Sequence, residues 1–412
     1  MVPKLRFTSF KDTWSSAYLS QLIVSLDAGV SVNSIDELPD DNEYSILKTS
    51  CVSFGYFDER ERKKVVKDEI SRLKEILLSN SILISRMNTP ALVGANAYIK
   101  DAPKNTFVPD RLWQVKVNDN ICNIKWLASF LSSDKGRYLL KEQASGTSNS
   151  MKNITKKDVF QIMLAFPCKE EQTIIADFLS SVDEKITLLN KQYDLLCQYK
   201  KGIMQKIFSQ EVRFKDEYGE EFPEWEESLL SERIKVQGGF AFKSQLFSEM
   251  ASTKVLRIGD ISEEIDLSAF SGVFSTETPA IRYQVNKGDF VMALSGATFG
   301  KMGLIKCESA FLNQRVATFR LLDNTTDILS FYYYYMSTME FINYIKSIPT
   351  ASAQPNISNK DIELYLSFIP TKKEQTKIAN FLSALDNKIA VKKAELDKLK
   401  TWKQGLLQQM FV

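Results

Sequence analysis

The strongest constraint on this chain is a segment of about 42 residues that occurs twice. Residues 167–208 and 370–411 agree at about 19 aligned positions without a gap. Apolar residues recur in each copy with a mean step of about 3.6 residues, which is the period of a helix with one apolar face. Each copy is therefore predicted to form one long helix. The apolar positions are Ile175, Phe178, Val182, Ile186, Leu189, Tyr193, Leu196, Tyr199, Ile203 and Ile207 in the first copy, and Ile378, Phe381, Leu385, Ile389, Leu396, Leu399, Trp402, Leu406 and Met410 in the second.

A helix of about 40 residues is about 60 Å long, because each residue adds about 1.5 Å. No small domain needs so long a helix for its own core. Two matched helices most simply bury their apolar stripes against each other, and an antiparallel coiled coil would relate the two halves by a pseudo-two-fold axis. The alternative is two independent helices, each packed on its own domain. The residues expected in the coiled-coil seam are Phe178, Val182, Ile186, Leu189, Leu196, Phe381, Leu385, Ile389, Leu396 and Leu399.

The duplication extends beyond the two helices. Residues 45–53 align with residues 254–262, and both segments alternate apolar and polar residues as strands do. The order of the elements is therefore expected to be the same in both halves. Further aligned pairs are Arg6 with Arg213, Trp14 with Trp225, Thr89 with Thr298, Gly94 with Gly303, and Arg111 with Arg315.

This order predicts a first globular domain (1–166), a first coiled-coil helix (167–210), a second globular domain (211–369) and a second coiled-coil helix (370–412). Each globular domain opens with short strands broken by Gly, Asn and Pro, which is typical of an α+β fold. The predicted fold class is therefore two similar α+β domains joined by two long helices. The amphipathic helices expected within the domains are residues 125–143 and 327–346.

The absence of histidine excludes a large part of enzyme chemistry. Without imidazole the chain lacks His-based acid–base catalysis, Ser-His and Cys-His nucleophiles, and His-containing metal sites. No catalytic and no metal-binding residue is predicted. The five cysteines have no CxxC spacing, which suits free thiols in a reducing cytoplasm, and no segment reads as a membrane span. The formal net charge of +2 neither requires nor excludes a nucleic-acid partner.

The polar loops between the strands combine basic, amide and hydroxyl side chains with aromatic residues. Asn and Gln can pair with adenine, Arg and Lys with guanine, and hydroxyls with phosphates or base edges. Any one of these residues would be ordinary in a loop, so their interpretation depends on the architecture. The candidates for DNA contact are Arg86, Asn88, Thr89, Lys104, Ser145, Thr147, Lys152, Phe242, Lys243, Ser295, Thr298, Lys301, Asn313, Gln314, Arg315 and Gln354.

The motif EQTIIADFLSSVDEKI and its second copy, EQTKIANFLSALDNKI, resemble the two helical regions of the specificity subunit (S, HsdS) of Type I restriction–modification systems. The segments ISRMNTPALVG and GGFAFKSQLF resemble the two target-recognition domains of that family. The resemblance covers essentially the full chain. It implies that each domain reads one half of a split, asymmetric DNA sequence, and that an antiparallel coiled coil separates the half-sites.

The resemblance also implies which partners the chain has. The coiled coil would bind two methyltransferase (M) subunits, and two restriction (R) subunits would complete the larger complex on double-stranded DNA. S-adenosylmethionine would be bound by the methyltransferase, so no cofactor is expected in this chain. The chain itself would be a non-catalytic, cytoplasmic subunit without membrane contact. Two features depart from the family pattern: the N-terminal RF…W segment is short, and the total charge is low for a DNA reader.

Two other functions are compatible with parts of the sequence. A coiled-coil protein–protein adaptor would share the long helices but would have no DNA readout. A self-sufficient DNA enzyme is disfavoured by the missing histidines. The glycine-rich loop SGATFGKMG also departs from a Walker A loop, because three residues instead of four separate its first two glycines and Met302 follows Lys301.

Overall fold

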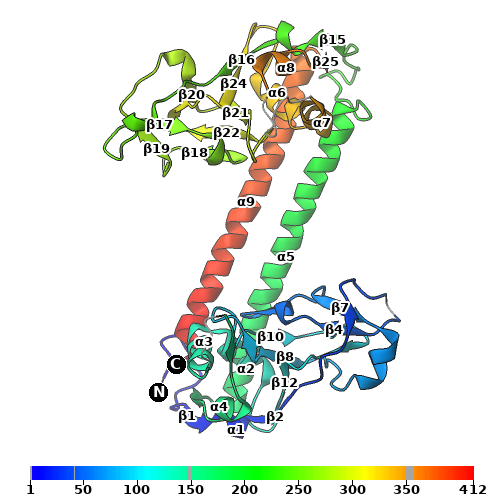
Figure 1. The fold of residues 1–412 in the computed structure, drawn as a ribbon, viewed down its shortest axis with the longest axis vertical. Helices are drawn as coiled ribbons and strands as arrows, with labels where there is room; N and C mark the ends of the chain where they lie inside the picture. The colour runs from blue at the N-terminus through cyan, green and yellow to red at the C-terminus, as the bar shows by residue number, and fades with distance from the viewer. Residues whose placement is uncertain (1, 41, 146–149, 349–356) are drawn as a thin grey trace. The chain divides into compact units, whose positions relative to one another are not determined.

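The structure is a computed structural model that describes residues 2–40, 42–145, 150–348 and 357–412 (Figure 1). It contains helices and strands in mixed order along the chain, as predicted for an α+β fold. No helix formed by these residues combines the length and the apolar character that a membrane span requires.

The chain forms two compact units. Unit 1 consists of Met1–Lys191 and Lys393–Val412, and unit 2 consists of Gln192–Lys392. The two long helices, α5 (Lys169–Phe208) and α9 (Lys372–Met410), each contribute to both units. In unit 1 the first part of α5 packs with the last part of α9, and in unit 2 the last part of α5 packs with the first part of α9. The two helices therefore run antiparallel, as the sequence predicts.

Every residue predicted for the seam is buried or half-buried, and Val182, Leu189 and Leu396 are the most buried of the ten. The periodicity also placed Tyr199 and Trp402 on the apolar stripe, but their side chains are 53% and 49% exposed. The Trp402 ring still meets the Phe178 ring of α5 edge to face at 6.1 Å, so Trp402 lies at the margin of the helix contact. Apolar residues that recur about every 3.6 residues gradually rotate away from the partner helix. The contact line between two paired helices instead recurs about every 3.5 residues.

Unit 1 is built around a four-stranded antiparallel sheet that has packed side chains on both faces. Consecutive side chains of a strand point to opposite faces. Ile82 and Ile84 therefore lie in one core with Trp126, whereas Leu83 lies in a second core with Leu47. The strands of this sheet are, in order, β10 (Asn96–Ile99), β8 (Ser81–Ser85), β12 (Leu112–Val117) and β2 (Ile23–Asp27).

The second core of unit 1 is closed by a smaller sheet, and short strand pairs complete the unit. The smaller sheet has the order β11 (Thr106–Phe107), β4 (Ser45–Leu47), β7 (Arg62–Val65) and β3 (Ser34–Ile35). The pairs are β1 (Ser15–Tyr18) with β14 (Met163–Phe166), β9 (Met87–Asn88) with β13 (Lys152–Asn153), and β5 (Val52–Ser53) with β6 (Tyr56–Phe57).

Unit 2 contains the same kinds of sheet. Its larger sheet has the order β16 (Ile234–Gly238), β24 (Val316–Leu321), β21 (Phe290–Ala293), β22 (Met302–Cys307) and β18 (Glu264–Asp266). Its smaller sheet has the order β19 (Val273–Ser275), β17 (Thr253–Leu256), β23 (Ser309–Leu312) and β20 (Gln284–Asn286). A strand pair is formed by β15 (Glu226–Leu229) and β25 (Leu366–Ile369).

The two units match element by element, as the repeated sequence predicts. Strands β10, β8, β12 and β2 correspond to β22, β21, β24 and β16, which are also paired in that order and antiparallel. In the smaller sheets, β7, β4 and β11 correspond to β19, β17 and β23, and in both units the last two of these pair in parallel. The differences lie at the edges, where unit 1 adds β3 and unit 2 adds β18 and β20.

The single amphipathic helix expected in each domain is in fact two helices. Ser133 lies between the first two with ψ at 161°, and its hydroxyl accepts a hydrogen bond from Gly136 N (3.1 Å). Thr338 does the same for Phe341 N (3.4 Å) in unit 2. Each hydroxyl caps the N-terminus of the following helix. A capping residue has an extended backbone conformation, so the preceding helix ends there. The helices are α2 (Ile124–Ser132), α3 (Asp134–Glu142), α6 (Leu329–Met336) and α7 (Met339–Ser347).

Short helices lie at the element boundaries. The α-helices are α1 (Leu19–Leu22), α4 (Lys156–Phe160) and α8 (Asn359–Glu363). The 3₁₀ helices are η1 (Thr49–Cys51), η2 (Lys67–Arg72), η3 (Leu230–Glu232), η4 (Ser244–Leu246), η5 (Ile258–Asp260) and η6 (Ile281–Tyr283).

One aligned pair in the sequence comparison is displaced. Gly94 corresponds to Gly300 and not to Gly303, which lies inside β22. Both glycines have positive φ, 78° and 75°, and their N–H groups donate to Ser85 O and Ala293 O, each at 2.9 Å. The segment from the end of β21 to Gly300 is two residues shorter than the segment from the end of β8 to Gly94. An alignment without gaps therefore pairs Gly94 with a glycine further along the chain. At both positions a side chain would be strained by the positive φ.

A buried glutamate at the start of each long helix joins that helix to the segment before the first strand of the same unit. Glu171 is 1% exposed and accepts two hydrogen bonds from the Arg6 guanidinium, both 2.7 Å long. The Trp14 indole N–H donates to the same carboxylate at 3.3 Å. In unit 2 the same contacts are made by Glu374, Arg213 and Trp225. The repeated Arg and Trp of the sequence are thus explained by one buried carboxylate in each unit.

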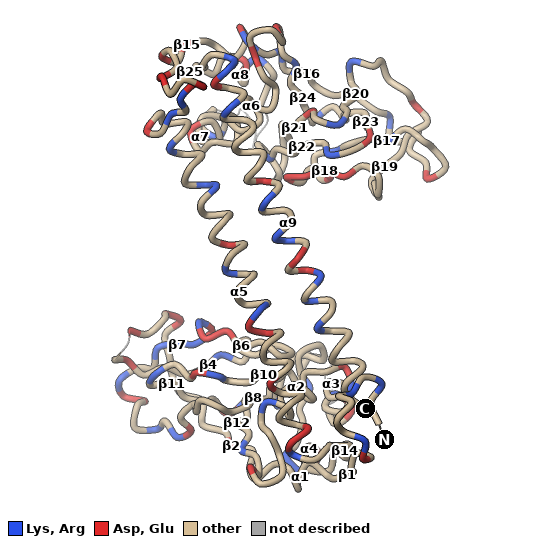
Figure 2. Tube along the Cα trace, turned by 180° about the vertical axis from the view of Figure 1, so that it is seen from behind, with Lys and Arg blue, Asp and Glu red and all other residues tan. Residues whose placement is uncertain are grey.

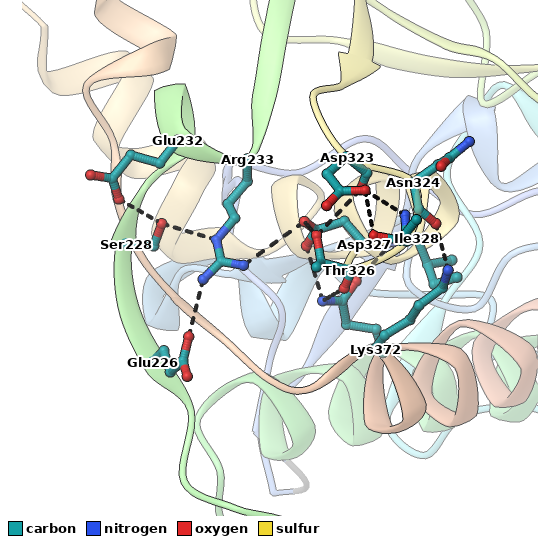
Figure 3. A network of polar contacts seen from close by, with 12 residues as sticks. Glu226, Ser228, Glu232, Arg233, Asp323, Asn324, Thr326, Asp327, Ile328 and Lys372 are labelled. Atoms are coloured by element: carbon teal, nitrogen blue, oxygen red, sulfur yellow. Dashed lines mark hydrogen bonds and ion pairs between the residues drawn. The ribbon is translucent and has the colours of Figure 1, made fainter.

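A polar network in unit 2 joins the start of α9 to the loop before α6 (Figure 3). Asp327 is buried and accepts hydrogen bonds from the Tyr332 hydroxyl (2.7 Å) and the Gln375 amide (3.1 Å). The Arg233 guanidinium lies 3.9 Å from the same carboxylate. Burial and then the bond to Asp327 raise the pKa of Tyr332, so its hydroxyl remains the donor. Lys372 also donates to a backbone oxygen of this loop, 2.5 Å away.

Replacing Glu171 with Gln tests the buried carboxylate of unit 1, because it keeps the side-chain shape and removes the charge that Arg6 binds. We expect the free energy of unfolding of unit 1 to fall by about 3 kcal/mol, since breaking a buried ion pair leaves its partner uncompensated. Urea denaturation of the purified chain measures this change. The control is Glu170→Gln on the exposed neighbour, which should change stability by less than about 0.5 kcal/mol. Equal losses in the two variants would contradict the assignment.

Leu396 tests the helix pairing, because it is 1% exposed whereas Val391 on the same helix is 66% exposed. We expect Leu396→Ala to lower the free energy of unfolding by about 2–5 kcal/mol, through lost burial and a cavity. Val391→Ala should be nearly neutral. Denaturation midpoints of the two variants measure the difference, and a Leu396→Ala variant as stable as the parent chain would refute the packing.

Candidate nucleic-acid interface

In unit 1 the structure brings several candidate residues together beside the end of β8. Lys152 lies opposite Asn88 in the β9–β13 pair. Asn153, the next residue, exchanges two backbone hydrogen bonds with Ser145, 2.9 and 3.0 Å long. Arg86 directly precedes β9. Residues that are distant in the sequence thus form one polar cluster.

The Asn88 side chain is held by local hydrogen bonds. Its amide nitrogen donates to Ser85 Oγ (3.2 Å), and its amide oxygen accepts from Thr89 N (2.8 Å). Thr89 is exposed. An asparagine fixed in this way presents its remaining donor and acceptor positions in one orientation, which a base-reading amide needs.

Of the other candidates, one lies away from this cluster, and two belong to segments that the structure does not describe. Lys104 is exposed and precedes β11 in the smaller sheet of unit 1. Thr147 and Gln354 lie outside the described residues.

In unit 2 the structure brings together two loops that carry six candidates. One loop follows β21 and the other joins β23 to β24, and a backbone hydrogen bond from Leu294 N to Arg315 O (2.9 Å) connects them. The Thr298 hydroxyl donates to Ile258 O (3.2 Å), which joins η5 to the same group. The candidates on these two loops are Ser295, Thr298, Lys301, Asn313, Gln314 and Arg315.

The remaining candidates of unit 2 follow β16 and adjoin the same loops. Phe240 forms a β-bridge with Asn313, and its ring meets the Phe242 ring edge to face at 5.0 Å. Lys243 is exposed, and its backbone N–H donates to Glu277. Phe242 is half-buried against other aromatic rings. It supports the loop and is also able to offer a ring face to a base.

Comparison of equivalent elements in the two units identifies Arg111 as a candidate that the sequence did not indicate. Arg315 O accepts a hydrogen bond from Leu294 N, and Arg111 O accepts the equivalent bond from Arg86 N (3.1 Å). Arg111 is exposed and begins the turn into β12. The sequence aligns Arg111 with Arg315, but the candidates predicted from it include only Arg315 of this pair.

Positive charge is dispersed over both units rather than gathered on one face. Lys, Arg, Asp and Glu are interspersed over the sheets, whereas Lys outnumbers Asp and Glu along α9 (Figure 2). In the smaller sheet of unit 1, Lys48 and Lys64 pair with Asp36 (2.6 Å) and Glu43 (2.5 Å). Among the residues that the structure describes, in contrast, four candidate side chains form no ion pair, which leaves their charge available to a phosphate or a base. They are Arg86, Lys104, Lys243 and Lys301.

The chemistry of both clusters is that of hydrogen bonding and charge, without a reactive centre. Within the described ranges no group of three His, Cys, Asp or Glu side chains could hold a metal ion. The clusters combine unpaired cations, oriented amides and hydroxyls at the loops of a packed sheet. This set of groups matches the donors and acceptors of nucleic-acid backbones and base edges.

Comparison with known proteins matches most of the chain to one family. The family described as "Type I restriction modification DNA specificity domain" matches twice, over residues 23–197 and 223–401. A similar protein is the Type I restriction enzyme MjaVIII specificity subunit of Methanocaldococcus jannaschii. It is 28% identical over 350 residues, which cover 81% of this chain and 80% of that protein. The EcoEI specificity subunit of Escherichia coli is 21% identical over 176 residues, which cover 42% of this chain and 30% of that one.

Solved structures of the same kind share the fold. The S subunit of a Type I restriction–modification system from M. genitalium superposes with a TM-score of 0.60 at 18% identity, over 100% of this chain and 99% of that one. A second chain, from a study of complex assembly and conformational transition of the type I R-M system, gives a TM-score of 0.55 at 14% identity, over 97% and 98% of the two chains. The two family matches, which repeat as the two units do, show that this chain belongs to the DNA specificity subunits of Type I restriction–modification systems.

Proposed function

We propose that this chain reads a split and asymmetric DNA sequence, with each unit binding one half-site. The observation that carries this proposal is the repetition of one fold with different loops. The larger sheets share their strand order, so both units present their loops on the same framework. Strand β3 is an addition of unit 1, and β18 and β20 are additions of unit 2. Two similar but unequal readers select two unequal half-sites.

The long helices would act as the spacer between the half-sites. At about 1.5 Å per residue, a helix of about 40 residues is about 60 Å long. This length exceeds the separation of about 34 Å between two sites one DNA turn apart. Linking the readers makes the second contact intramolecular, so the complete target is bound much more tightly than either half. The DNA sequence is then selected only when both halves are present.

The chain would contribute recognition while its partners contribute catalysis. We propose two methyltransferase subunits, which bind S-adenosylmethionine, and restriction subunits in the complete complex. Support for two equivalent binding surfaces comes from exposed apolar residues that repeat on the two helices. Leu188 of α5 and Val391 of α9 are equivalent, and so are Tyr199 and Trp402, and all four are exposed. Exposed apolar side chains at equivalent positions suit two copies of one protein partner.

The reader function is tested by mapping DNA methylation in single molecules from cells that express this chain with its methyltransferase. We expect one split motif with two different halves, methylated on both strands, and its loss in cells that lack only this chain. The control is the same methyltransferase with another specificity subunit, which shows that the enzyme is active. If that control methylates DNA and this chain directs no motif, the chain is a protein adaptor without DNA readout.

The docking surfaces are tested by Tyr199→Asp, which places a charge in the apolar surface of unit 2. We expect the purified complex to lose one of its two methyltransferase subunits, because burying an unpaired carboxylate in an interface is unfavourable. Mass photometry of the complex measures the change. Gln198→Asp, on the exposed neighbouring residue, is the matched control and should leave the mass unchanged. A full-size complex with Tyr199→Asp would exclude this surface.

A further inference from the structure

Arg86 occupies a fixed position in the backbone of unit 1. Its N–H donates to Arg111 O (3.1 Å), and its carbonyl oxygen accepts from Ile154 N (2.8 Å). These bonds connect Arg86 to the start of β12 on one side and to the residue after β13 on the other. The main chain at Arg86 is therefore held from two directions before any ligand binds.

The Arg86 side chain is oriented but has unused hydrogen-bonding capacity. Its guanidinium carbon lies 5.8 Å from the centre of the Trp113 ring, within the range of a cation–π contact. Its Nε is buried and has no hydrogen-bond partner among the described residues, and the same holds for Oδ1 of Asn153, which lies opposite Met87 in the β9–β13 pair. Buried polar atoms without partners are uncommon, because each costs free energy in the absence of a ligand. A residue directly before this strand pair and a residue within it thus keep a donor and an acceptor that a polar ligand would complete.

The equivalent position of unit 2 has the same backbone and a different side chain. Leu294 N donates to Arg315 O (2.9 Å), and Leu294 O accepts from Ile357 N (3.1 Å), which repeats both bonds of Arg86. The Leu294 side chain, however, is 5% exposed and lies in the apolar core. In the strand beside it, Ala317 takes the place of Trp113. The arginine on its indole is therefore a feature of unit 1 that the framework itself does not require.

We propose that Arg86 is the specificity-determining residue of unit 1 and that its guanidinium donates hydrogen bonds to O6 and N7 of a guanine in the half-site that this unit reads. This inference rests on the proposed function. The planar guanidinium matches the two acceptors of guanine, and this pairing needs a fixed orientation, which the indole and the two backbone bonds provide. A contact to phosphate would need no such orientation, because phosphate offers acceptors in many directions.

The first test compares methylation maps for Arg86→Lys and Arg86→Leu with the map of the parent chain. Lysine keeps the charge without the planar fork, and leucine reproduces the residue of unit 2. We expect both variants to lose the preference for guanine at one position of one half-site, by about tenfold, and to keep the other half-site unchanged. Arg62→Lys is the matched control, because the Arg62 Nε is also buried without a partner but lies on β7 in the smaller sheet. The control should leave the motif unchanged.

The second test uses the parent chain, so it does not depend on the folding of a variant. Target DNA with 7-deazaguanine at the assigned position lacks the N7 acceptor, and we expect the assembled complex to bind it about tenfold more weakly. The Arg86→Lys complex should bind both DNAs equally. An unchanged motif with Arg86→Lys, or equal binding of both DNAs by the parent complex, overturns the assignment of Arg86. The absence of any motif with the parent chain would instead refute the proposed reader function.

Discussion

One buried carboxylate at the start of each long helix determines how each unit closes. Glu171 and Glu374 are almost fully buried, and an unpaired carboxylate in such a place would be strongly destabilising. Each carboxylate is paired with an arginine that precedes the first strand of its globular part, 165 positions away in unit 1 and 161 in unit 2. The two ends of each globular part are thereby joined at the helix that leaves it. In each unit the ion pair holds the segment before the first strand against the long helix that follows the last strand.

The repetition of this arrangement explains which differences between the units are tolerated. The larger sheet contributes side chains to the cores on both of its faces, so changes in its strands would disturb packing. Loops and edge strands bury fewer side chains, and additions such as β3, β18 and β20 occur there. A chain with two copies of one framework can therefore change its loops in each copy separately. Different loops on equal frameworks follow from this distribution of packing.

The sequence was sufficient for the plan of the fold, because long periodic helices and repeated motifs carry strong signals. It could not give the break at Ser133, where one hydroxyl turns an amphipathic stretch into two helices. The sequence also could not show that Gly94 corresponds to Gly300. The loops before these glycines differ by two residues in length, and no local sequence pattern indicates that difference. For the candidate site, residue type alone selected Arg86 and Lys104 equally. Only the tertiary contacts separate an oriented guanidinium from an exposed lysine.

The pair Arg86 and Leu294 shows how one framework accommodates two side chains with opposite requirements. The backbone hydrogen bonds at the two positions are the same, so neither side chain alters the main chain. Leucine lies in the core of unit 2, whereas arginine lies over Trp113, which is itself buried in the core of unit 1. The indole also gives the cation a favourable surface that an alanine could not give. The change from leucine to arginine is thus accompanied by a second change, from alanine to tryptophan, on the neighbouring strand, and the fold of the unit is retained.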